Sequence, residues 1–153
     1  MAMGNSPDDI RMAVQKFTDA MVKKDQEALA ACFAEDCEIE FLHVKLKGKR
    51  GVREWAHWLY GHLSELQFDR ITSVVNDGVI FEEYVLNGRL HNGSKIRSRQ
   101  TEVLVFDENR MIKNFRFYFD RLDFIESGIN KIMAKQIVNT FNQKTLKSLK
   151  SHG

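Results

Sequence analysis

The segment 114–125, NFRFYFDRLDFI, limits the possible folds of this chain more than any other stretch. Aromatic and polar side chains alternate along it, Phe115, Phe117 and Phe119 with Arg116, Tyr118 and Asp120. This period of two predicts a β-strand with one apolar and one polar face. Three phenylalanines on one face would form an exposed apolar patch, so we expect them to pack beneath helices or in an interface between two sheets. We expect the polar face to line a cavity, where charge and hydrogen bonds are used.

The rest of the chain alternates between helical and strand periodicity. The predicted elements begin with a helix capped by Asp8 or Asp9 and a short helix capped by Asp25. They continue with a strand at 38–42, a solvated loop at 45–50, a helix at 52–66 and strands at 68–75, 79–86, 95–106 and 111–119. Turns are expected at Asn76-Asp77-Gly78, Asn87-Gly88 and Asp107-Glu108-Asn109. Asn87-Gly88 is the strongest of these hairpin signals. From Arg121 onward the pattern is helical again.

Segregated helices and antiparallel strands are typical of an α+β fold. We expect a strongly curved antiparallel sheet wrapped around the N-terminal helices, which leaves a cone-shaped hollow suited to a ligand. Residues 1–128 are expected to form this domain. Residues 129–153, which are rich in lysine, are expected to form a basic helical extension of it.

Composition and charge bear on the expected partners and location of the protein. The 153 residues fit one domain, and a formal net charge of +2 gives no reason to expect a nucleic-acid partner. No apolar run approaches the roughly 18 residues of a membrane helix, and the first residues are too polar for a signal peptide, so we expect no membrane association and a cytoplasmic location. The two cysteines, Cys32 and Cys37, are expected to be buried free thiols.

Four stretches together resemble the SnoaL-like family of the nuclear transport factor 2-like superfamily, which includes polyketide cyclases and is akin to ketosteroid isomerases and limonene epoxide hydrolases. They are DDIRMAVQKFTDAMVKKD, EALAACFAEDCEIEF, TEVLVFDENRMIKNFRFYFD and RLDFI, and they span about residues 8 to 125. The resemblance implies a cone-shaped α+β barrel. It also implies dimerisation through the outer sheet face, so we expect a homodimer.

The resemblance also implies roles for particular residues. Asp120 matches the acid that ends the last strand and serves as general acid/base in the cyclases. Phe41 stands where the isomerases place their base, which argues against a typical ketosteroid isomerase. The epoxide hydrolases use two carboxylates flanking an arginine. Here Asp120 with Arg99 or Arg116 supplies part of that set, and Glu83 and Glu102 are candidates for the second acid.

Each candidate residue also has a structural explanation. Asp120 can act as a proton-transfer group with a pKa raised by burial, or can cap a helix that begins at Arg121. Tyr84 and Tyr118 can donate to a ligand oxygen or can be amphipathic core residues. Arg97 and Arg99 share a face, and the strand register decides whether it is the cavity or solvent.

The third predicted helix and the first strand supply the remaining candidates. Trp55 and Trp58 form an aromatic stripe that belongs to the core, the cavity or both. His43, just past the first strand, is a pocket candidate because imidazole titrates near physiological pH.

The sequence contains no phosphate loop, dinucleotide motif or metal-ligand spacing, so we expect no cofactor and no metal. We predict a small-molecule enzyme that moves a proton with Asp120 on an apolar, oxygenated ligand, as a cyclase or isomerase does. Epoxide hydrolysis is a weaker fit. The alternative is a non-catalytic ligand-binding or dimerisation module of the same fold.

Overall fold

The computed structural model describes residues 5–124, 139–140, 142–147 and 150–151. Three helices precede most of the sheet: α1 (Pro7–Lys23), α2 (Gln26–Ala30) and, after two strands, α3 (Gly48–His62). The strands are β1 (Phe33–Phe41), β2 (Val44–Lys47), β3 (Leu63–Asn76), β4 (Val79–Leu90), β5 (Lys95–Phe106) and β6 (Ile112–Tyr118). The predicted α+β class is confirmed.

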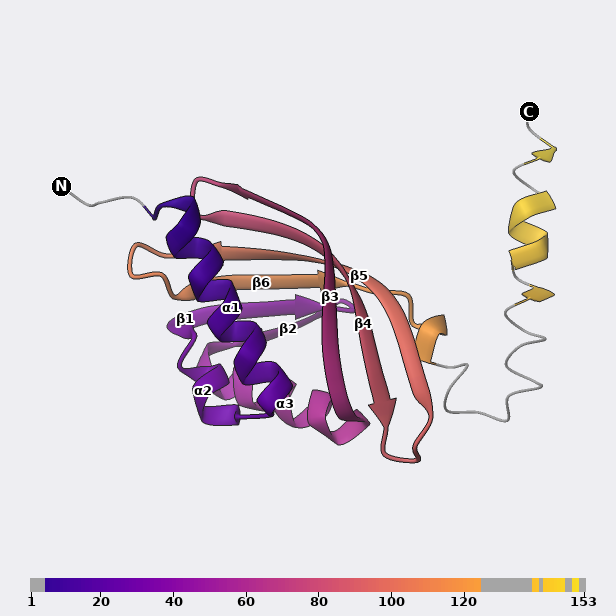
Figure 1. Cartoon of the computed structure of the whole chain (residues 1–153), viewed down its shortest axis with the longest axis horizontal. Helices are drawn as coiled ribbons and strands as arrows, with labels where there is room; N and C mark the ends of the chain where they lie inside the picture. Colours follow the sequence, from indigo (N-terminus) through magenta and orange to yellow (C-terminus); the bar gives the residue numbers. More distant parts are fainter. Residues whose placement is uncertain (1–4, 125–138, 141, 148–149, 152–153) are drawn as a thin grey trace.

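All six strands form one sheet in the order β2-β1-β6-β5-β4-β3. Strands β3 to β6 form the predicted antiparallel meander, whereas β1 pairs with β6 in parallel, so the sheet is mixed rather than purely antiparallel. The long strands β3, β4 and β5 bend along their length, and the sheet curls around α1 without closing (Figure 1). This curvature gives the sheet an inner face and an outer face.

Local sequence explains where the first two helices begin. Ser6 is the N-cap of α1: its hydroxyl accepts from the backbone N–H of Asp9, whose carboxylate in turn accepts from the Ser6 backbone N–H. Asp9 is therefore the partner in a capping box rather than the cap itself. Asp25 caps α2 as predicted, because its carboxylate accepts from the Ala28 backbone N–H at 2.9 Å.

Aromatic rings join the helices to the sheet in the core. Phe17 of α1 lies 5.8 Å from Phe33 of β1, 5.3 Å from Phe115 of β6 and 6.3 Å from Trp55 of α3, measured between ring centroids. Phe117, the next inward residue of β6, stacks on Phe41 at 4.8 Å. The phenylalanines of β6 therefore pack beneath the helices, one of the two positions expected for them.

The predicted loop at 45–50 is divided between β2 and the first turn of α3, and one predicted turn lies inside a strand. Residues 44–47 form β2, which a two-residue turn joins to β1: Leu42 and His43 both have positive φ, the geometry of a tight hairpin turn. The turn predicted at Asn87-Gly88 is wrong, because β4 continues through it to Leu90. Gly88 is needed for close packing instead: a Cβ there would lie 3.1 Å from the Glu65 carbonyl oxygen and 3.1 Å from Ile96.

The other two hairpin turns are confirmed. Asp77 and Gly78, both with positive φ, connect β3 to β4. The Asp107 carboxylate accepts from the backbone N–H groups of Asn109 and Met111 and so shapes the turn into β6. With these turns the register is fixed, and the face to which each side chain points follows from it.

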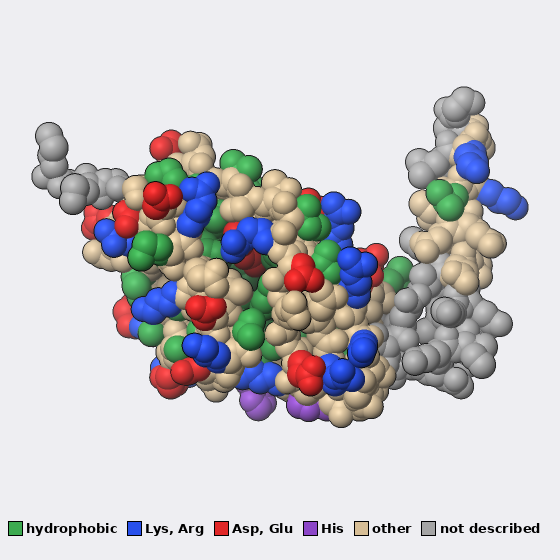
Figure 2. All heavy atoms as spheres, viewed as in Figure 1, with side chains coloured by type: hydrophobic (Ala, Val, Ile, Leu, Met, Phe, Trp, Pro, Cys, Tyr) green, Lys and Arg blue, Asp and Glu red, His purple; other side chains and the backbone are tan. Residues whose placement is uncertain are grey.

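The outer face of the sheet exposes several apolar side chains. Phe81 is 52% exposed, Val74 55% and Tyr118 59%. On the face of the body seen in Figure 2, acidic and basic side chains are interspersed rather than gathered by sign. The homodimer expected through the outer face stays a prediction.

No helix among the described residues is long and apolar enough to cross a membrane. Residues 142–147 are helical and exposed. The expected boundary near residue 129 lies outside the described residues.

Candidate functional site

An apolar cavity of about 400 Å³ lies between α3, the inner face of the sheet and the segment after β6. Its lining residues are Leu42, Trp58, Leu59, His62, Leu63, Leu86, Leu90, Gln100, Phe117, Phe119, Arg121 and Phe124. Only four of them, Trp58, His62, Gln100 and Arg121, carry a polar side-chain group. Mostly apolar walls with a few fixed polar groups are typical of small-molecule sites.

Gln100 is the buried polar group of this cavity, with 6% of its surface exposed. Its Oε1 accepts from the Tyr84 hydroxyl at 3.1 Å, and its Nε2 donates to the Ser98 hydroxyl at 3.2 Å. The Ser98 hydroxyl donates to the Asp123 carboxylate at 2.8 Å. Because that carboxylate accepts the Ser98 hydrogen, the Ser98 oxygen is left to accept from Gln100, which sets the orientation of the amide.

One hydrogen on Nε2 of Gln100 has no acceptor among the described residues, since the amide group carries two and one goes to Ser98. A buried N–H without a partner costs more than an unused lone pair on a carbonyl oxygen. Gln100 therefore favours a ligand that brings a hydrogen-bond acceptor.

The two exposed polar groups of the cavity wall are His62 and Arg121. Nδ1 of His62 lies 2.8 Å from the Trp58 carbonyl oxygen. A carbonyl oxygen only accepts, so Nδ1 carries a hydrogen, and in the neutral ring Nε2 is the unprotonated nitrogen. An imidazole held in this tautomer can remove a proton through Nε2.

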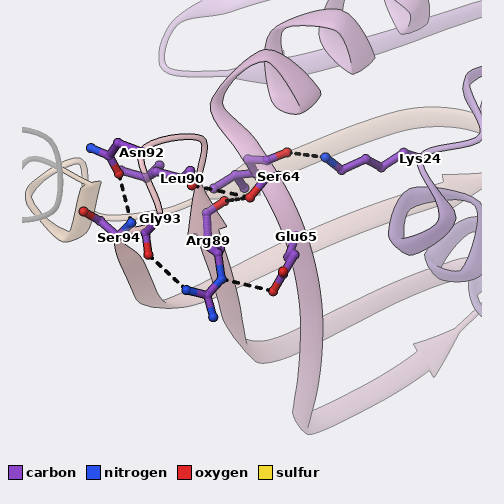
Figure 3. A network of polar contacts seen from close by, with 9 residues as sticks. Lys24, Ser64, Glu65, Arg89, Leu90, Asn92, Gly93 and Ser94 are labelled. Atoms are coloured by element: carbon purple, nitrogen blue, oxygen red, sulfur yellow. Dashed lines mark hydrogen bonds and ion pairs between the residues drawn. The ribbon is translucent and has the colours of Figure 1, made fainter.

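Polar contacts fix the end of the cavity formed by Leu63 and Leu90 (Figure 3). Lys24 donates to the Leu63 carbonyl oxygen at 2.6 Å, and the Ser64 hydroxyl donates to the Arg89 carbonyl oxygen at 3.1 Å. Arg89 itself donates to the Glu65 carboxylate at 3.3 Å and to the Gly93 carbonyl oxygen at 3.0 Å. These bonds tie β3, the end of β4 and the β4–β5 hairpin together.

A second, polar cavity of about 130 Å³ lies where α1 crosses β3, β4 and β5. Its lining residues are Gln15, Thr18, Met21, Phe68, Arg70, Glu82, Tyr84 and Glu102. Glu82 and Glu102 are 4% and 3% exposed, although acidic residues are rarely buried. Arg70 pairs with Glu82 at 2.8 Å.

Burial, followed by the charge of Glu82, raises the pKa of Glu102 to about 8. Its carboxyl group therefore keeps its proton at neutral pH. Burial and the neighbouring Glu102 likewise raise the pKa of Tyr84 well above its ordinary value, so its hydroxyl remains a donor. Tyr84 lines the polar cavity together with Glu102 and donates to Gln100 of the apolar cavity, so it links the two cavities.

The structure separates the predicted site residues into inner and outer groups. Trp58 lines the apolar cavity and Tyr84 lines the polar one. Trp55 is a core residue, 3% exposed, and its Nε1 has no hydrogen-bond partner among the described residues. His43 is exposed and lines a shallow groove of about 220 Å³ beside Tyr118 rather than the main cavity.

The expectation that Arg99, Arg116, Tyr118 and Asp120 face the hollow is wrong. Burial of the phenylalanines of β6 beneath the helices turns the alternate residues of that strand outward. Arg116 bonds Asn114, and Arg99 pairs with Glu83 on the same outer face. Asp120 is exposed, and its carboxylate accepts from the Leu122 backbone N–H at 2.9 Å, the capping position considered for it.

Sequence reasoning missed Gln100 and Glu82 and named Glu102 only as a possible second acid. All three lie on the inner faces of neighbouring strands, with Glu82 opposite Glu102 and Tyr84 opposite Gln100 across the β4–β5 ladder. The available signal was the common face of Ser98, Gln100 and Glu102. Among the described residues, no cluster of three or more His, Cys, Asp or Glu side chains is placed to hold a metal.

The curved sheet, the helices across its inner face and the apolar cavity define a protein of the nuclear transport factor 2-like cone fold. The family model described as "SnoaL-like domain" matches residues 14–114. The chain belongs to this SnoaL-like family. No curated protein matches the chain significantly.

Solved structures share the fold at low sequence identity. An NTF2-like protein of Burkholderia xenovorans is 18% identical, with a TM-score of 0.67 over 82% of this chain and 100% of that one. An LEH-like epoxide hydrolase of M. tuberculosis is 16% identical, with a TM-score of 0.66 over 84% and 95%. The epoxide hydrolase/cyclase-like enzyme SalBIII, which acts in pyran ring formation, is 12% identical, with a TM-score of 0.69 over 78% and 96%.

Proposed function

We propose that the protein is a cofactor-independent enzyme that binds an apolar molecule carrying a carbonyl oxygen and moves a proton on the carbon next to it. The apolar cavity with one buried amide donor carries this proposal. The walls would hold the hydrocarbon skeleton, and the unpaired Nε2 hydrogen of Gln100 would bond the ligand oxygen. This reaction class includes isomerisation and aldol-type cyclisation.

In the proposed reaction, Nε2 of His62 takes the proton from the carbon next to the carbonyl group. The C–H bonding electrons form the C=C bond of an enolate, and the carbonyl electrons move onto the oxygen. Gln100 donates a hydrogen bond to that oxygen, which stabilises its charge. The imidazolium then returns the proton to carbon, at the same or a conjugated position.

The test is exchange of the α-hydrogens of 2-decalone for deuterium in D2O, followed by proton NMR. Wild type should accelerate exchange over buffer. His62→Gln should lose most of the acceleration, on the order of a hundredfold for a positioned general base. His57→Gln is the matched control, since His57 is exposed on the same helix and does not line the cavity. Equal rates for wild type and His62→Gln would refute the reaction.

A non-catalytic binding module is the second candidate. The observation that favours it is the absence of a carboxylate among the cavity-lining residues that the structure describes. Saturable binding of 2-decalone without any exchange above buffer would support this function. Absence of both binding and exchange would refute the two proposals together.

A further inference from the structure

Arg121 is a positive charge at the rim of the apolar cavity and has no ion-pair partner among the described residues. The acidic residues nearest to it along the chain, Asp120 and Asp123, bond other groups. Asp120 accepts from the Leu122 backbone N–H at 2.9 Å, and Asp123 accepts from the Ser98 hydroxyl at 2.8 Å. The cavity-lining residues that the structure describes include no carboxylate. The guanidinium group is therefore available to an anionic ligand.

The backbone around Arg121 is fixed against the cavity. Phe119 stacks on Phe117 of β6 with 5.8 Å between ring centroids, and Phe124 packs edge-on against Phe119 at 5.2 Å. The Phe124 backbone N–H donates to the Arg121 carbonyl oxygen at 3.1 Å, which closes a turn between the two rings. Phe119, Arg121 and Phe124 all line the cavity. These contacts hold the arginine at the cavity wall.

We propose that Arg121 is a specificity-determining residue: it makes the protein selective for apolar ketones that carry a carboxylate group at the end lying at the rim. This inference rests on the proposed function for the position of the ketone, whose oxygen would bond the buried amide of Gln100. The apolar walls would hold the skeleton between the two groups. The planar guanidinium group offers parallel N–H donors that match the two oxygens of a carboxylate. The substrate class is therefore a keto acid with an apolar skeleton.

The other polar groups of the wall do not repel an anion at the rim. His62 is either neutral or positively charged, and Trp58 contributes an indole N–H, which only donates. Gln100 is neutral and buried. A neutral ketone would use only the walls and Gln100, whereas an ammonium group would be repelled by Arg121. The guanidinium group therefore distinguishes ligands by their charge.

Two ligands that differ in charge but share one skeleton test the inference. They are 6-oxodecahydronaphthalene-2-carboxylate and its methyl ester, each titrated into the protein and followed by 1H–15N NMR. Wild type should bind the carboxylate about fivefold more tightly than the ester, the upper end for an ion pair within reach of solvent. Added salt should reduce this preference, because it screens the charges.

Arg121→Gln should bind both ligands with the affinity that wild type has for the ester. Arg97→Gln is the matched control, because Arg97 is an exposed arginine of β5 that does not line the cavity, and its replacement removes the same charge. This control should keep the preference for the carboxylate.

The possible failures are distinguishable. If wild type binds the carboxylate no more tightly than the ester, the inference is overturned while the proposed function stands. The same holds if Arg121→Gln keeps the preference, or if Arg97→Gln loses it to the same extent. If wild type binds neither ligand, the proposed function and the inference both fail.

Discussion

Replacement of Glu102 by Gln should change how the stability of the protein depends on pH. Burial and the charge of Glu82 raise the pKa of this carboxyl group from 4.5 to about 8. The folded protein therefore keeps a proton that the unfolded chain releases between these pH values. The free energy of unfolding of wild type should consequently fall as the pH rises from about 4.5 to about 8, and this contribution should be constant above that range.

The magnitude follows from the two pKa values. One pKa unit corresponds to about 1.36 kcal/mol, so the full contribution is on the order of 5 kcal/mol. Gln has nearly the shape of the protonated acid and does not titrate. The stability of Glu102→Gln relative to wild type should therefore increase by that amount between pH 4.5 and pH 8.

Urea unfolding followed by circular dichroism, repeated at several pH values on both sides of the range, measures this difference. Glu83→Gln is the matched control, because it is the same substitution on the outer face of the adjacent strand. Subtraction of the control separates the effect of the buried position from that of losing a carboxyl group. A stability difference between Glu102→Gln and wild type that does not vary with pH would refute the electrostatic argument.

Three further substitutions test the packing of the core and the sheet and the expected homodimer. Phe115→Ala should lower the free energy of unfolding by about 3–5 kcal/mol in urea titrations, because the ring is 2% exposed and contacts Phe17 and Trp55; a loss below about 1 kcal/mol would contradict its place in the core. Gly88→Ala should cost about 1–3 kcal/mol by the same assay, since the new Cβ would press on β3 and β5, and an unchanged stability would contradict this close packing. Phe81→Glu should turn the predicted homodimer into a monomer in sedimentation velocity, and an unchanged sedimentation coefficient would place any dimer contact elsewhere.

The order of elements could be predicted from the sequence because each depends on local signals. The period of two in 114–119 located β6 correctly, and Asp77-Gly78 located the turn between β3 and β4. The same period cannot tell which face of β6 is inside, because it only divides the residues into two sets. Burial of the phenylalanines decided this, since their apolar area outweighs what Arg116 and Tyr118 could gain in a cavity.

The buried acidic residues of the polar cavity were harder to predict for a related reason. Glu82 and Glu83 are adjacent on β4, with apolar residues on both faces of the strand, so composition gives no preference for either as the buried acid. The pairing of β4 with β5 decides which of the two is buried, because Glu82 lies opposite inward-facing Glu102 and Glu83 lies opposite Thr101. Acidic side chains are usually exposed to water, and a prediction from sequence follows this tendency. Such a prediction therefore fails where an acidic side chain is buried at a cost in the stability of the fold. Glu102 occupies a position where burial costs stability, and the two-residue period of the strand cannot reveal such a position.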